Sequence, residues 1–148
     1  MSTFRRILHA SDFSPASRPA FRRALDLARA NRARLTLVHV YSPVIPMMGE
    51  GYAPAQVYDK WFADVRADAE RRLGRLVAQA KKRGVRAKGL VLEGIPHERI
   101  VRAARSTRAD LIVLGTHGRT GLGRLFLGSV AARVVTLAPC PVLTVRAR

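Results

Sequence analysis

The chain has 148 residues, a single cysteine and a formal net charge of +17, with 27 lysines and arginines against 10 acidic residues. This length predicts one domain over residues 1–148, with a core that needs no metal or disulfide. Cys140 has no partner for an intrachain disulfide, and Met1–Arg6 lacks the apolar stretch of a secretory signal, so we expect a cytoplasmic location. Apolar runs such as Leu111–Leu114 fall short of the roughly 20 residues that cross a bilayer, which excludes a transmembrane protein.

The positive charge predicts a surface field that attracts phosphates, nucleic acid or anionic membranes, and it does not choose among them. Basic residues are spread from Arg22-Arg23 to Arg108, which favours solvated helix faces over a dedicated nucleic-acid groove. Few aromatic residues interleave with them, whereas a single-strand binding surface needs several for base stacking. Binding of nucleic acid or another polyanion therefore stays as an alternative function.

The chain opens with a strand, a turn and a helix. Ile7–Ala10 is a short apolar strand, and Ser11–Pro15 follows as the turn into a helix. Ser14 fits the N-cap and Pro15 the first helical position, while Pro19 indicates either a later start or a bend in the first turn. Apolar residues at helical spacing then continue the helix to Ala28.

The next segments predict a second strand, a loop and a long helix. Leu35–Tyr41 is apolar on both faces, which is typical of a central strand in a parallel sheet. Pro43–Pro54 has no periodicity and is predicted as a loop that could act as a lid. Gln56–Arg83 has the spacing of an amphipathic helix, closed by Gly84.

The rest of the chain continues the alternation of strand and helix. Its predicted elements are a strand at Val85–Leu92, a helix from Pro96 to Ala104, a strand at Asp110–Leu114, a helix at Ser129–Leu137 and a strand at Pro141–Val145. Alternation of this kind predicts an α/β fold with a five-stranded, doubly wound parallel sheet and helices on both faces.

Ligands of such sheets bind beyond the carboxyl ends of strands, which directs attention to the loops after the first and fourth strands. The loop Gly115–Arg124 contains four glycines and two arginines, and Gly128-Ser129 then begins a helix. Glycines let backbone N–H groups approach phosphate oxygens, and a helix N-terminus adds donors and a favourable dipole. By composition alone, a phosphate site and a plain turn are equally good interpretations.

The spacing of this loop adds to its composition. Gly115, Gly118, Gly128 and Ser129 form the pattern G-x2-G-x9-G-[S/T], which resembles the signature of the universal stress protein family. The similarity covers practically the whole chain, through Ile7–Ser14, Gly94–Pro96, Leu127–Val130 and Ala138–Leu143. The resemblance implies a Rossmann-like fold of the adenine nucleotide alpha hydrolase-like type, and a stress-response module that binds ATP, with Mg²⁺ accompanying the phosphates.

The resemblance also implies a role for each site residue. In ATP-binding members the residue at Asp12 contacts the ribose, the backbone at Val40 contacts adenine, and the glycine loop and following helix start hold the phosphates. Ala10 stands where many of these members have proline, so we expect a looser adenine pocket and a modest loss of affinity. The predicted nucleotide-binding residues are Ala10, Asp12, Val40, Gly115, His117, Gly118, Arg119, Gly128, Ser129 and Val130.

Motifs of other nucleotide enzymes are missing from the sequence. It has no G-x-x-x-x-G-K-[S/T] and no G-x-G-x-x-G after the first strand, which argues against a P-loop NTPase and a dinucleotide-binding enzyme. No second carboxylate or convincing general base accompanies Asp12, so we expect binding without efficient turnover. A slow ATPase or nucleotide hydrolase that uses Asp12 or His117 remains the alternative.

Two further predictions concern His117 and the last strand. The His117 imidazole either donates to a phosphate or faces solvent, and the sequence leaves both open. His9 and His39 lie within strands and are predicted to be core residues with satisfied hydrogen bonds. The strand Pro141–Val145 is predicted at a sheet edge, where unpaired backbone groups favour pairing with another chain, and the resemblance points to a homodimer through that edge.

Overall fold

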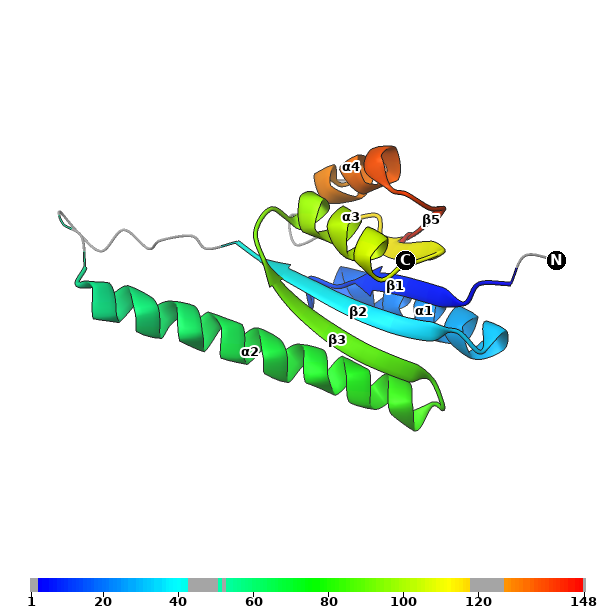
Figure 1. Ribbon diagram of the computed structural model, residues 1–148, viewed down its shortest axis with the longest axis horizontal. Coiled ribbons are helices and arrows are strands. Elements are labelled where there is room, and N and C mark those ends of the chain that lie inside the picture. The colour runs from blue at the N-terminus through cyan, green and yellow to red at the C-terminus, as the bar shows by residue number, and fades with distance from the viewer. Residues whose placement is uncertain (1–2, 43–50, 52, 118–126, 148) are drawn as a thin grey trace.

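The computed structural model of the chain describes residues 3–42, 51, 53–117 and 127–147 (Figure 1). In chain order its elements are β1 (Arg6–Ala10), the 3₁₀ helix η1 (Pro15–Ser17), α1 (Arg18–Asn31), β2 (Arg34–Tyr41), α2 (Ala55–Lys82), β3 (Arg86–Glu93), α3 (Pro96–Ser106), β4 (Leu111–Gly115), α4 (Ser129–Leu137) and β5 (Val142–Val145). None of the helices in these ranges is long and apolar enough to span a membrane.

The five strands form one parallel sheet in the order β3-β2-β1-β4-β5. The chain runs outward from β1 to β3 and then crosses to β4 on the other side of β1. The strand order therefore reverses between β1 and β4, where sheets of this class bind their ligands. The predicted α/β, Rossmann-like fold with a doubly wound five-stranded parallel sheet is confirmed.

Helices cover both faces of the sheet, with α1 and α2 on one face and α3 and α4 on the other (Figure 1). Alternate strand residues feed the two layers: Ile7 packs against α1 and α2, whereas Leu8 packs against α3 and α4. Strands β1 and β4 are buried on both faces, which explains their continuous apolar sequences. The amino-terminal part of α2 extends beyond the sheet (Figure 1).

The start of the first helix resolves the choice between Pro15 and Pro19. Both positions are used, because η1 begins at Pro15 and α1 begins at Arg18 with Pro19 in its first turn. The first N–H groups of a helix have no intrahelical acceptor, so a proline there loses no hydrogen bond. Ser14 is the N-cap of η1 by position, but its side chain makes no capping hydrogen bond.

Candidate functional site

A cleft of about 320 Å³ lies beyond the carboxyl ends of β1, β2 and β4, at the point where the strand order reverses. The start of α4 closes one side of the cleft, and the first turns of α3 close another. Among the predicted site residues, those that line it are Ala10, Asp12, Val40, Gly115, His117, Gly128, Ser129 and Val130. The fold thus brings three separate segments of the sequence to one place.

The predicted site residues and the described lining of the cleft do not fully coincide. Gly118 and Arg119, also predicted as site residues, lie outside the described residues. Lining residues that were not predicted are Ser11, Ser17, Pro96, Ile100, Leu114, Thr116 and Ala131. Four of these are direct sequence neighbours of predicted residues and could have been found on that basis. Ser17, Pro96 and Ile100 reach the cleft only through the packing of η1 and α3.

The turn after β1 places Asp12 at the edge of the cleft. Its Oδ1 accepts hydrogen bonds from the Ser14 N–H at 2.9 Å and from the Ser14 hydroxyl at 2.6 Å. Between them, Phe13 has a φ of 63°, a left-handed conformation that costs a residue with a side chain about 1–2 kcal/mol. Strained backbone of this kind is typical of functional sites, where surrounding contacts hold it in place.

Contacts on both sides of Phe13 hold this strained turn. The Phe13 N–H donates to Ser11 Oγ at 3.1 Å, and its ring stacks on the His39 imidazole with centroids 4.2 Å apart. His39 is held in turn by a 2.8 Å hydrogen bond between its Nδ1 and the Ser11 carbonyl. The Arg72 guanidinium lies 5.9 Å from the Phe13 ring centre, so α2 also supports the turn. The position of Asp12 is therefore fixed by β2 and α2 as well as by its own loop.

At Gly128 the backbone passes close to the backbone of Thr116. Its N–H donates to the Thr116 carbonyl at 2.6 Å, joining the two described ends of the glycine-rich segment. A Cβ atom at this position would meet that carbonyl oxygen at 2.9 Å, closer than real Cβ contacts allow. Glycine is needed here for space. At Gly115 the nearest atom to a Cβ would be 3.5 Å away, which is an ordinary contact.

The amino terminus of α4 opens into the cleft. Its N-cap is Gly128, which has no side chain to satisfy the N–H groups of the first turn. The first intrahelical bond of the helix runs from Ala132 N–H to the Gly128 carbonyl, so the three preceding N–H groups have no acceptor within the helix. Together with the helix dipole, these donors favour an anionic ligand such as phosphate. Nearby, Thr116 Oγ1 and His117 Nδ1 lie 2.9 Å apart.

His9 lies beside the cleft but points into the core. It is fully buried, its Nδ1 lies 2.9 Å from the Val113 carbonyl, and its ring packs against Phe21. Burial lowers the pKa of His9 to about 4, against smaller opposing effects of the Val113 bond and the Asp12 charge. The prediction of a core histidine is right, but only half of its hydrogen bonding is satisfied, because Nε2 has no partner among the described residues.

A family model described as the universal stress protein family matches residues 3–146 of the chain. The chain belongs to the universal stress protein family. A universal stress protein of Thermus aquaticus is 41% identical over 143 residues, which are 97% of this chain and 99% of the relative. The family expected from the glycine spacing is confirmed.

Solved universal stress protein structures show the same fold. UspA from Lactobacillus plantarum is 27% identical with a TM-score of 0.84, and the match covers 99% of this chain and 100% of that one. A universal stress protein solved in complex with cAMP is 25% identical with a TM-score of 0.68, over 99% of this chain and 100% of that one.

Proposed function

We propose that this universal stress protein binds ATP, accompanied by Mg²⁺, in the cleft beyond β1 and β4, and acts as a stress-response module without efficient turnover. The observation that carries the proposal is that Asp12 and the open amino terminus of α4 line one cleft where the strand order reverses. The relative solved in complex with cAMP supports an adenine nucleotide as the class of ligand.

The lining of the cleft suits the three parts of the nucleotide. Val40, Ile100 and Leu114 supply apolar surface for the base, and the adenine edge is left to backbone groups at the end of β2. Asp12 supplies a carboxylate for the ribose hydroxyls. The first N–H groups of α4 receive the phosphates, beside His117. Ala10, which lacks the proline ring of many relatives, is expected to weaken adenine packing modestly.

The donor set of the cleft fits a magnesium ion that arrives with ATP. Asp12 is the carboxylate among the described lining residues, and Mg²⁺ in nucleotide sites is commonly held by one or two carboxylates together with phosphate oxygens. In the part of the chain that the structure describes, no group of three or more acidic, histidine or cysteine side chains could hold a metal by itself. The phosphates would supply the remaining ligands, and the metal would neutralise their charge.

Titration calorimetry with ATP and Mg²⁺ tests binding, with Gly128→Ala as the variant and Gly74→Ala as the control. The added Cβ pushes the start of α4 away from Thr116, so we expect a loss of about tenfold or more in affinity, equivalent to about 1.4 kcal/mol. Gly74 lies exposed on α2 with open space around it, and its variant should bind as the wild type does. A wild type that fails to bind ATP below millimolar concentration contradicts the proposal.

Absence of efficient turnover is tested by phosphate release at saturating ATP and Mg²⁺. Asp12 Oδ1 already accepts two hydrogen bonds from Ser14, which supports a binding role over that of a general base. We expect release no greater than in a sample without protein. Release that Asp12→Ala abolishes would favour the slow ATPase instead.

We also propose a homodimer through β5, in a cytoplasmic protein. The strand lies at the sheet edge with β4 on one side, and large apolar side chains are exposed on β5 and on α4 beside it. They are Val130, Val135, Leu137 and Leu143. Light scattering should give a dimer for the wild type and a monomer for Leu143→Lys. Ile95→Lys, which changes a residue 51% exposed at the start of α3, should stay dimeric. A monomeric wild type excludes this dimer.

A further inference from the structure

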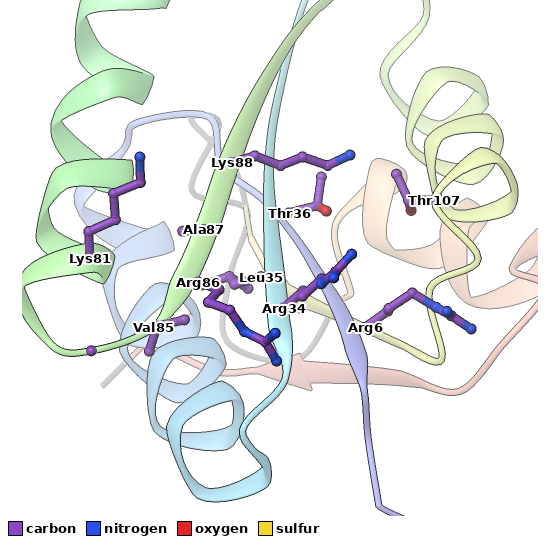
Figure 2. Close-up of a pocket in the computed structure, with 11 residues that line it drawn as sticks. Arg6, Arg34, Leu35, Thr36, Lys81, Val85, Arg86, Ala87, Lys88 and Thr107 are labelled. Carbon is purple, nitrogen blue, oxygen red and sulfur yellow. The ribbon is translucent and has the colours of Figure 1, made fainter.

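A second hollow, of about 550 Å³, lies at the opposite end of the sheet from the cleft. The amino-terminal halves of β1, β2 and β3 line it, together with the end of α2 and Thr107 after α3 (Figure 2). We call it the amino-end hollow. Among the described residues, its lining includes five cations and no acidic side chain: Arg6, Arg34, Lys81, Arg86 and Lys88.

The strand register aligns three of these cations. Arg6 pairs with Arg34, and Arg34 pairs with Arg86, so the three arginines are direct neighbours across β1, β2 and β3. Neighbouring strands lie about 4.8 Å apart, and paired residues point to the same face of the sheet. Lys88 lies on that face two residues beyond Arg86, opposite Thr36. Like charges directly opposite one another destabilise a sheet, so this row is maintained against an electrostatic cost.

Carboxylates do not neutralise the row within the described part of the chain. The ion pairs there join Arg66 to Glu70 and both Arg71 and Arg72 to Asp68, and all of them lie along α2. Asp110 contacts the start of β1, where its oxygens accept the backbone N–H groups of Arg5 and Arg6 at 2.9 and 3.0 Å. The cationic side chains of the hollow are exposed, so a ligand can reach them.

Backbone carbonyls hold two of the guanidinium groups in place. Arg6 Nε donates to the Arg108 carbonyl at 2.7 Å, and Arg86 Nη2 donates to the Arg32 carbonyl at 3.0 Å. A guanidinium has five N–H donors, so each retains donors for a second acceptor. In Figure 2, Arg6, Arg34 and Lys88 extend from their strands to the same side of the sheet, toward Thr107. Arg6 and Arg86 are held before any ligand arrives, which lowers the entropy cost of binding through them.

We propose that the amino-end hollow binds a polyphosphate group, meaning two or more linked phosphates, independently of the nucleotide cleft. Arginine forks match phosphate oxygens in pairs, and a row of cations across three strands matches a linear chain of anionic groups. The described residues of the lining include no aromatic side chain on which a nucleic-acid base could stack.

Titration calorimetry with inorganic tripolyphosphate at physiological salt tests the proposal. The variant is Arg34→Gln with Lys88→Gln, and the control is Arg22→Gln with Arg23→Gln, which removes the same charge from the exposed face of α1. Because the variant loses charged hydrogen bonds to the phosphates, we expect its affinity to be at least about tenfold weaker than that of the wild type. The affinity of the control should stay within about twofold of the wild type. Equal losses in both, or no binding by the wild type, overturn the proposal. Thermal melts establish that both proteins are folded.

Measuring both ligands on the variants of both sites shows which site binds the phosphates. It also tests whether the hollow acts independently of the cleft. Gly128→Ala should weaken ATP binding in the cleft and leave tripolyphosphate binding unchanged. Arg34→Gln with Lys88→Gln should weaken tripolyphosphate binding and leave ATP binding unchanged. If Gly128→Ala also abolishes tripolyphosphate binding, the phosphates enter the cleft and the proposal is wrong. If random-sequence RNA displaces tripolyphosphate and binds the wild type more tightly, with the same loss in the double variant, the hollow is a nucleic-acid surface instead.

Discussion

His9 shows how one buried side chain sets a response to pH. The imidazole lies wholly within the core, and its neutral form is favoured because burial removes water from the charged form. In the unfolded chain the same group returns to an ordinary pKa of 6.5, whereas in the fold the pKa of His9 is about 4. Between these values the unfolded state binds more protons than the folded state. Acid therefore favours unfolding in that window.

We predict that the free energy of unfolding falls as the pH is lowered from about 6.5 to about 4 and that His9→Asn flattens this fall. The full effect is on the order of 3 kcal/mol, at about 1.4 kcal/mol for each tenfold change in proton affinity. Urea unfolding across this pH range measures it. His97→Asn, which removes an imidazole from a half-buried position in the first turn of α3, is the control and should keep the wild-type slope. An unchanged slope in His9→Asn contradicts the assignment.

At the scale of elements, α2 packs against β3 through a position without a side chain. A Cβ at Gly89 of β3 would lie 3.0 Å from Leu73 Cδ2 and 3.2 Å from Val77 Cγ2 of α2. Leu73 is 2% exposed and belongs to the core between α1, α2 and the sheet, so it has little room to move. The close approach of this helix and strand therefore depends on glycine.

We predict that Gly89→Val destabilises the protein by about 1–3 kcal/mol, the usual cost of overpacking a core. Gly74→Ala lies one residue after Leu73 but faces open space, and it should stabilise the helix by about 0.5–1 kcal/mol. Opposite shifts of the urea midpoints of the two variants are the expected result. A stable Gly89→Val protein would mean that α2 moves freely on β3.

The elements were predictable where the signal is local. Short apolar runs predicted all five strands, and Arg86–Glu93 differs from its predicted range by a single residue at each end. The left-handed Phe13 was not predictable, because that conformation is usually taken by glycine or asparagine and is held here by His39 from β2. Likewise Pro96 and Ile100 join the cleft only through the packing of α3. The sequence alone could assign the cleft residues beside the strand ends and at the glycine-rich start of α4, and not those that the packing of α3 contributes.

At the scale of the whole molecule, the charge of +17 becomes interpretable once the cations are placed. Arg6, Arg34 and Arg86 are far apart in the sequence, and only the register of parallel strands makes them neighbours. Other arginines, such as Arg22 and Arg23, lie on exposed helix faces, as the spread of charge predicted. Net charge of this size attracts nucleic acid without sequence preference, and such binding weakens steeply with salt.

The same charge predicts that salt stabilises the fold. Repulsion among exposed cations opposes the compact state, and added salt screens it over a Debye length that shortens to about 10 Å at 0.1 M. The ion pairs that salt would weaken in the described residues are exposed pairs along α2, and exposed pairs contribute little to stability. Screening of repulsion therefore outweighs their loss, and we expect the melting temperature to rise between low and physiological NaCl. The melting temperature of Arg22→Gln with Arg23→Gln should rise less with salt, since this variant has less repulsion to screen. A wild-type melting temperature that falls with salt would show that attractive pairs dominate this surface.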